Sequence, residues 1–226
     1  MNLNDDFTKR ASAHAATTPW VASPMPGVDR RMLDRIGDEV ARATSIVRYA
    51  PGSRFSPHVH TGGEEFFVLE GVFEDEHGAF PAGSYIRNPP ESSHTPGSEP
   101  GCVIFVKLWQ FDMTDRTHIR SDTGKLAYLP VDQGVEAAPL FADGREDVRM
   151  ERWAPGASVA LDAKDGMELL VIRGSFEEKG EAFVEQSWLR LPKGATATAV
   201  AGPEGATVWI KRDHLAEAPK APHSNS

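Results

Sequence analysis

The sequence predicts an all-β protein made of two similar halves, and three observations support this. Short runs rich in Val, Ile, Phe and Tyr are bounded by turns rich in Gly, Pro, Asn and Ser. The one helix candidate in the first half has loose apolar spacing. Three segments recur in the same order about 104 residues later. A repeat of this size, built from short strands, is typical of a β-sandwich or jelly roll.

Four segments of the first half read most clearly as strands. They are 44–50 (TSIVRYA), 65–75 (EFFVLEGVFED), 83–89 (GSYIRNP) and 102–111 (CVIFVKLWQF). The helix candidate is 30–43 (RRMLDRIGDEVARA), which Gly37 interrupts. We therefore expect two strands there, joined at the sequence GDE.

The internal repeat sets the expected domain boundaries. YAPGSRF, EEFFVLEGVFED and GCVIFVKLWQFD are echoed by WAPGASV, MELLVIRGSFEE and GATVWIKRDHL. The polar, turn-rich segment between the two series reads as a linker. We expect a flexible N-terminal arm (1–20), a first domain (21–112), a linker (113–134), a second domain (135–214) and a disordered tail (215–226).

Composition excludes several classes of function. The formal charge of −9 gives the chain no electrostatic reason to bind nucleic acid or an anionic membrane. No apolar run approaches the roughly 20 residues needed to span a bilayer. The N-terminus lacks the apolar core of a signal peptide, so we expect a cytoplasmic protein. The single cysteine, Cys102, rules out an internal disulfide and a cysteine-based zinc site.

Ligand-type residues gather at the start of one predicted strand. His58 and His60 are two residues apart, so an extended chain presents both imidazoles on one face. The turn TGG follows, and Glu64 can return its carboxylate to the same point. His94, in a Pro-rich turn before the last strand of the half, is the natural fourth ligand. Three imidazoles and one carboxylate suit Zn, Fe, Mn, Ni or Co and leave coordination positions open.

These residues resemble the two cupin motifs. The first motif, G-x5-H-x-H-x3-E-x6-G, is matched from Gly52 to Gly71 without exception. The second, G-x5-P-x-G-x2-H-x3-N, is matched at Gly83, Pro89 and His94, but Glu91 and Ser98 replace its usual Gly and Asn. The resemblance implies two tandem cupin domains, each a jelly-roll β-barrel. It is strong over 20–112 and weaker over 135–214.

The sequence around the two motifs also resembles the ChrR-like branch of the cupins. That resemblance implies one divalent metal ion per chain, zinc or iron with Mn or Ni as alternatives, and a role in sensing or responding to oxidative stress. Similar cupins are iron dioxygenases that act on small diketones or hydroxyaryl ketones, so the expected partner at the metal is a small molecule or O2. ChrR-like anti-sigma factors carry a separate zinc-binding helical domain. The short arm here lacks its cysteines, so we expect no direct binding to a sigma factor.

Some residues near the motifs admit more than one interpretation. Glu65 competes with Glu64 for the carboxylate role, and the spacing to Gly71 favours Glu64. Tyr85 and Arg87 precede the His94 turn, where they could contact a substrate or orient a ligand. Cys102 begins an apolar strand, so we interpret its thiol as inert packing, with redox sensing as the alternative.

The second half lacks these ligands. Aligned on the Pro-Gly turns, the four ligand positions hold Asp162, Lys164, Glu168 and Ala197. This set does not form the same metal site, so we expect the second half to be structural. Because exposed strand edges tend to pair, we also expect a homodimer.

Overall fold

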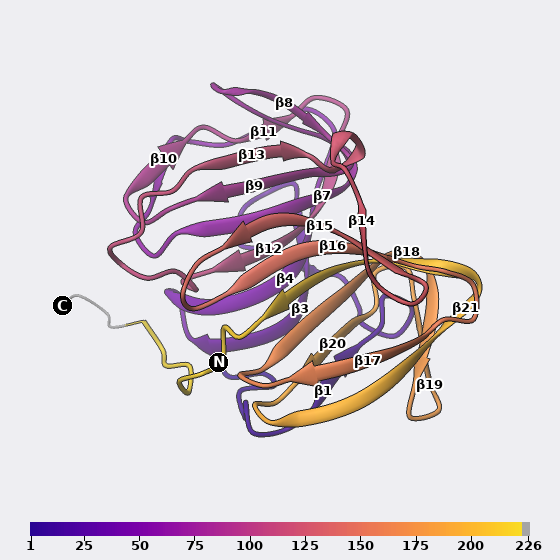
Figure 1. Ribbon diagram of the computed structural model, residues 1–226. Helices are drawn as coiled ribbons and strands as arrows, with labels where there is room; N and C mark the ends of the chain where they lie inside the picture. The colour runs from indigo at the N-terminus through magenta and orange to yellow at the C-terminus, as the bar shows by residue number, and fades with distance from the viewer. Residues whose placement is uncertain (223–226) are drawn as a thin grey trace. The chain divides into compact units, whose positions relative to one another are not determined.

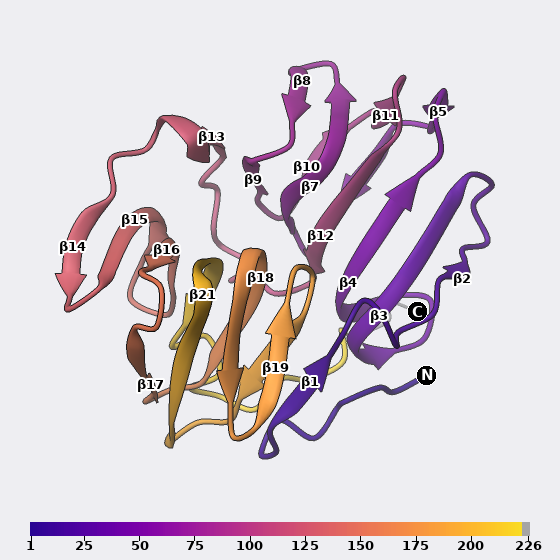
Figure 2. The ribbon, with the colours of Figure 1, turned by 90° about the vertical axis from the view of Figure 1, so that its right-hand side faces the viewer.

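The computed structural model describes residues 1–222, and Figures 1 and 2 show the ribbon from two sides. The chain forms two compact units. The first contains Met1–Asp5, Pro19–Gly124 and the described residues from Lys220 onward. The second contains Asp6–Thr18 and Lys125–Pro219. The expected all-β architecture is confirmed, with one 3-10 turn, η1 (Thr123–Lys125), among the described residues.

The first unit is a ten-stranded sheet plus a two-stranded ribbon. Its main path runs β13-β9-β7-β12-β4-β3-β2, and the ribbon pairs β10 with β6. Its strands are β2 (Val21–Ala22), β3 (Val28–Gly37), β4 (Ala41–Tyr49), β5 (Ser53–Arg54), β6 (His58–His60), β7 (Glu64–Asp75), β8 (Gly78–Pro81), β9 (Ser84–Asn88), β10 (Ser92–His94), β11 (Gly97–Ser98), β12 (Cys102–Leu108) and β13 (Ile119–Asp122). All four strands predicted most clearly lie within β4, β7, β9 and β12 or overlap them closely.

The helix candidate of the first half is two strands, as preferred from the sequence. β3 and β4 pair antiparallel from Val28↔Tyr49 to Gly37↔Ala41. Gly37 has a φ of 114°, and a Cβ there would lie 2.6 Å from the carbonyl oxygen of Val40. Glycine therefore permits the tight connection that ends β3.

Side-chain alternation gives the first unit its core. Phe66 and Val68 of β7 and Ile104 and Val106 of β12 lie on one face and are buried together. The same cluster includes Ile86 of β9, so adjacent strands contribute to one apolar interior. Successive strand residues point to opposite faces, so the intervening side chains lie on the other side of the sheet.

The second unit is a nine-stranded sheet with the order β1-β20-β18-β21-β16-β15-β14 along its main path. Its strands are β1 (Ala11–Ala13), β14 (Leu129–Asp132), β15 (Val135–Ala142), β16 (Asp147–Trp153), β17 (Ser158–Ala163), β18 (Met167–Glu178), β19 (Glu181–Val184), β20 (Trp188–Leu191) and β21 (Ala195–Arg212). Its interior is filled by an apolar cluster that includes Trp153, Phe176 and Phe183.

The N-terminal segment differs from the expected flexible arm. Ala11–Ala13 form β1, which pairs with β20. Arg10 forms ion pairs with Glu178, at 2.7 Å, and with Glu181. His14 Nε2 lies 2.7 Å from a Glu181 oxygen. Backbone pairing and these charged contacts hold the segment against the second unit, although its composition alone predicted a flexible arm.

The expected linker and tail also contain ordered parts. β13 pairs with β9 in the first unit, and β14 pairs with β15 in the second, so strands lie within residues 113–134. In the expected tail, Leu215 is buried and its backbone N–H donates to the carbonyl of Asp165. Residues 223–226 of that tail lie outside the described residues. The described part of the chain includes no helix with the length and apolar character needed to cross a bilayer.

Candidate metal centre

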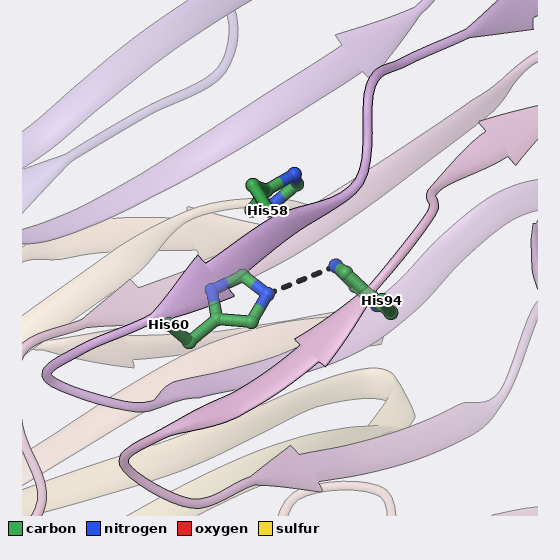
Figure 3. A group of neighbouring side chains, drawn as sticks. All are labelled: His58, His60 and His94. Atoms are coloured by element: carbon green, nitrogen blue, oxygen red, sulfur yellow. Dashed lines mark hydrogen bonds between the residues drawn. The ribbon is translucent and has the colours of Figure 1, made fainter.

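Three histidines converge where the two-stranded ribbon of the first unit forms (Figure 3). β6 and β10 pair antiparallel with His58 opposite His94, and His60 lies two residues beyond His58. One nitrogen of each ring can be chosen so that all three lie within 4.8 Å of one another. His60 Nε2 and His94 Nε2 are 2.9 Å apart. Short ribbon pairing thus brings together residues 34 positions apart in the sequence.

Glu64 brings a carboxylate to the same point. It is the first residue of β7, and its Oε2 lies 3.3 Å from His60 Nε2 and 3.6 Å from His94 Nε2. Asn88 Nδ2 donates to the same oxygen over 3.4 Å. The four residues predicted as ligands are therefore neighbours in the structure.

The turn between the ligands requires glycine for packing. A Cβ on Gly62 would lie 2.0 Å from the ring of Trp109, and one on Gly63 would lie 2.5 Å from the ring of Phe111. Gly63 also has a φ of 77°. These two aromatic rings close over the turn that separates His60 from Glu64, which holds the carboxylate near the histidines.

The donor set fits a metal ion. With metal–nitrogen distances of about 2.0–2.1 Å, neighbouring ligand atoms of one coordination sphere lie about 3.0–3.4 Å apart. The separations of His60 Nε2 from His94 Nε2 and from Glu64 Oε2, 2.9 and 3.3 Å, are close to this range. Imidazoles and a carboxylate are also the donor types that such ions bind. The cluster could therefore hold a metal ion.

Asp75 orients one of the histidines. Its Oδ2 lies 3.2 Å from His94 Nδ1, and both side chains are buried. Burial alone would raise the pKa of Asp75, but the hydrogen bonds from His94 and from the backbone N–H of His77 lower it. The sequence analysis did not identify Asp75. The one available signal was an acidic residue at the end of the strand that begins with Glu64.

The histidines differ in basicity. Burial lowers the pKa of His60. The charge of Glu64 acts against this shift, and the charges of His94 and His58 add to it. Burial also disfavours the charged form of His94, but its hydrogen bond to Asp75 and the charge of Glu64 raise its pKa overall. A carboxylate behind a metal-binding imidazole fixes its ring and increases its basicity.

A cavity of about 250 Å³ adjoins the histidines. His58, His60 and Glu64 line one part of it, and residues of β3, β4 and β12 line much of the rest. Most of those walls are apolar, with Val47, Ile104, Val106, Leu108 and Trp109 among them. A molecule bound here would lie next to the donor cluster.

Tyr85 and Arg87 do not line this cavity. On β9 they alternate with Ile86, which belongs to the interior cluster, so they face the other side of the sheet. The Tyr85 hydroxyl donates to Glu65 over 2.6 Å, and Arg87 pairs with Asp115 over 2.8 Å. This placement does not support the prediction that either residue contacts a substrate.

The two departures from the second cupin motif have visible structural roles. Glu91 has a φ of 71°, in the left-handed region that explains why glycine is usual there. Gly194 occupies the matching turn of the second unit, with a φ of 78°. The Ser98 hydroxyl donates to the carbonyl of Val72 over 2.7 Å. His94 keeps its position despite both changes.

In the second unit, strand pairing corrects the alignment of three ligand positions by one residue. His58 pairs with His94 in the ribbon of the first unit, and Leu161 pairs with Ala197 between β17 and β21. Glu64 begins β7, as Met167 begins β18. The structural counterparts of the ligands are Leu161, Ala163, Met167 and Ala197.

The residues that the sequence alignment had selected lie elsewhere. Asp162 and Lys164 are exposed. Glu168 is buried, and it accepts hydrogen bonds from Trp188 Nε1 over 3.3 Å and, through its other oxygen, contacts His214 Nε2 over 3.0 Å. Apolar side chains thus fill every position that corresponds to a ligand of the first unit.

Two strand-built units, one with converging histidines, define the class of the protein as a bicupin. The chain matches the ChrR cupin-like domain family twice, over residues 8–112 and 116–216. It therefore belongs to the ChrR cupin-like domain family. A comparison with curated protein sequences found no significant match.

Solved structures show the same fold at low sequence identity. A candidate dioxygenase from Nostoc punctiforme is 17% identical, with 97% of this chain and 88% of that one covered and a TM-score of 0.77. A candidate glyoxylate-induced protein from Pseudomonas aeruginosa is 14% identical, with coverages of 96% and 92% and a TM-score of 0.72. An oxalate decarboxylase variant from Bacillus subtilis is 12% identical, with coverages of 90% and 77% and a TM-score of 0.61.

Proposed function

We propose that the first unit binds one divalent metal ion through His58, His60 and His94, with Glu64 as the fourth ligand. The proposal rests on the convergence of His60, His94 and Glu64, whose donor atoms lie 2.9–3.6 Å apart, with a nitrogen of His58 within 4.8 Å of those of the other two histidines. The position of Asp75 supports this proposal, because its carboxylate contacts Nδ1 of His94 and leaves Nε2 of that histidine for the metal. The second unit contributes no ligand, since its corresponding positions are apolar.

We propose further that the centre acts on a small organic molecule in the adjoining cavity, as a metal-dependent oxygenase. A metal ion bound there would supply Lewis-acid character and a site for O2. The apolar walls of β4 and β12 would exclude water, and Glu64 would contribute negative charge beside the histidines. The similarity in fold to a candidate dioxygenase is consistent with this reaction class but does not carry the proposal.

A sensing role is the second candidate. Membership of the ChrR cupin-like family favours it, and His58 and Val59 are exposed, so a small oxidant could reach the centre from solvent. In this case the metal would be zinc, as the family resemblance implies. It would have a structural role until an oxidant displaced or modified the residues that bind it.

Metal content tests the shared part of both candidates. Elemental analysis of purified protein should give about one equivalent of divalent metal per chain. The double variant His58→Ala/His60→Ala should lose it, while the second unit stays folded by circular dichroism. His118→Ala is the matched control, because that histidine is exposed and distant in sequence from the ribbon. Two equivalents per chain, or full metal in the double variant, would show that the assignment is wrong.

Oxygen uptake separates the two candidates. Iron-loaded protein should consume O2 in the presence of a small diketone or a 2-oxo acid if it is an oxygenase. Uptake with none of a panel of these compounds would contradict that role. Zinc bound at one equivalent and exchanging slowly would then favour the sensor.

We also propose a homodimer. β14 ends the sheet of the second unit, and its Leu129 and Val131 are exposed. Exposed apolar residues on an edge strand favour pairing with another chain. Light scattering coupled to size exclusion should give twice the mass of 24.6 kDa, and a monomer at micromolar concentration would contradict this proposal.

A further inference from the structure

Two arginines lie on the otherwise largely apolar wall of the cavity beside the histidines. Arg30 and Arg35 of β3 both line it. Their cross-strand partners on β4 are Val47 and Ala43, which also line it. Both arginines therefore border this cavity, and both also border a second, more open hollow that Asp38 and Glu39 line.

Arg30 has no carboxylate partner among residues 1–222. Its side chain is half-buried, and no ion pair or hydrogen bond of its guanidinium is found in the described part of the chain. Arg35 donates to the backbone carbonyls of Gly37 and Asp38, and the Asp38 carboxylate also acts on its charge, so Arg30 is the less compensated of the two. Burial and the positive charge of Arg30 lower the pKa of Arg35, and the charge of Asp38 acts against that shift. Two like charges facing one cavity create a site that favours an anion.

Tyr49 adds a neutral donor to the same cavity. It lies on β4, two residues from Val47, and its ring packs against Phe55 with a centroid distance of 5.0 Å. Burial, with the charge of Glu64, raises the pKa of its hydroxyl, whereas Arg30 acts against that shift. The hydroxyl therefore remains protonated at neutral pH and can donate a hydrogen bond.

The dimensions of the cavity limit the ligand to a small molecule. Ligand pockets usually have volumes of about 300–1,000 Å³, and this one has about 250 Å³. Arg35, Ala43, Leu108 and Glu64 form one row across β3, β4, β12 and β7. Three strand spacings of about 4.8 Å separate the backbones at the ends of that row by about 14 Å. Arg35 and Glu64, at the two ends of that row, both line the cavity, so a short molecule would span the space between them.

We propose that the ligand of this cavity is a small organic acid with an apolar body, whose carboxylate is bound by Arg30 with Arg35 beside it and whose other oxygen faces the histidines. This inference rests on the proposed function, because it names the class of molecule that the centre acts on. The apolar wall from Val47 to Val106 contacts the body of the acid. The Tyr49 hydroxyl donates to one of its oxygens.

The test compares an acid with its uncharged analogue. Calorimetric titration of the protein as purified would use 4-methyl-2-oxopentanoate and its methyl ester, which differ in charge at one end. The acid should bind at least about 10-fold more tightly, as expected for charge-assisted hydrogen bonds. Arg30→Gln should remove this preference and leave the affinity for the ester unchanged. Arg48→Gln is the control, because Arg48 is exposed on the neighbouring strand and should keep the preference.

Equal binding of acid and ester by the wild type would overturn the proposal, as would an unchanged acid preference in folded Arg30→Gln. If Arg30→Gln does not fold, Arg30→Lys replaces it. Lysine keeps the charge but lacks the planar fork, so acid affinity should fall, and an unaltered affinity would overturn the proposal.

Metal content measured in every sample keeps this inference distinct from the proposed function. After removal of metal by a chelator, the acid should still bind more tightly than the ester, because the arginines are not ligands. Full metal without an acid preference would overturn the ligand class alone. An acid preference in a protein that never binds metal would overturn the proposed function alone.

Discussion

Replacing Asp75 by asparagine should weaken metal binding without unfolding the first unit. The Asp75 carboxylate lies 3.2 Å from His94 Nδ1, and the two side chains are only 1% and 3% exposed. A hydrogen bond to a charged partner contributes about 1.5–3 kcal/mol. Loss of a carboxylate that orients a metal-binding histidine typically costs about 10–100-fold in affinity, which corresponds to a similar free energy. Asparagine keeps the size of the side chain and can still accept from the backbone N–H of His77.

The assay is a competition titration of metal against a chelator of known affinity at pH 7.5, with wild type and variant side by side. Glu99→Gln is the matched control, since it removes one carboxylate from an exposed ion pair with Arg54 in the same unit. We expect an affinity about 10–100-fold lower for Asp75→Asn and no change for Glu99→Gln. A decrease of less than about twofold for Asp75→Asn would refute the argument that Asp75 positions His94.

Two further predictions concern stability. Gly71→Ala should destabilise the protein by about 1–3 kcal/mol more than Gly52→Ala. Both residues have positive φ, but only a Cβ on Gly71 would meet a backbone atom, 2.0 Å from the carbonyl oxygen of Gly101. Equal losses of stability in urea unfolding would show that this contact relaxes. Burial would raise the pKa of Glu181, but hydrogen bonds from His14, Ser12 and Arg10 lower it to about 2. Its contribution is therefore present above the unfolded-state pKa, near 4.5, and is lost as pH falls toward 2. Glu181→Gln should melt below wild type at pH 7, and the difference should shrink between about pH 5 and 2; a constant difference would contradict this.

Much of the candidate centre could be predicted from the sequence because its information is local. The spacing of His58, His60 and Glu64 places three donors on one strand and the next strand start, and alternation decides which side each faces. The β3–β4 pair was also predictable, since Gly37 marks the turn between them. Short apolar runs and the internal repeat were enough for the all-β fold and the two units.

Different echoes of the repeat align the second half differently, and only strand pairing decided between the alignments. The repeat is offset by 104 residues at Tyr49 and Trp153 but by 103 at Gly71 and Gly174. A slip of one residue moves every side chain of a strand to the other face. Strand pairing therefore replaced Asp162 by Leu161 and Glu168 by Met167 as the counterparts of His58 and Glu64.

The sequence by itself determined the fold class, the repeat and the grouping of His58, His60 and Glu64, because each depends on local pattern or spacing. His94 was expected there from the motif resemblance, and the pairing of β6 with β10 brings it to the other donors. Only the tertiary structure decided which distant side chains surround them. Asp75 reaches His94 because β11, just after His94, pairs with β7 beside Asp75, and Arg30 borders the cavity through the register of β3 with β4. These contacts depend on which strands become neighbours and in which register, and the long-range pairing that sets both is not encoded in any one local pattern.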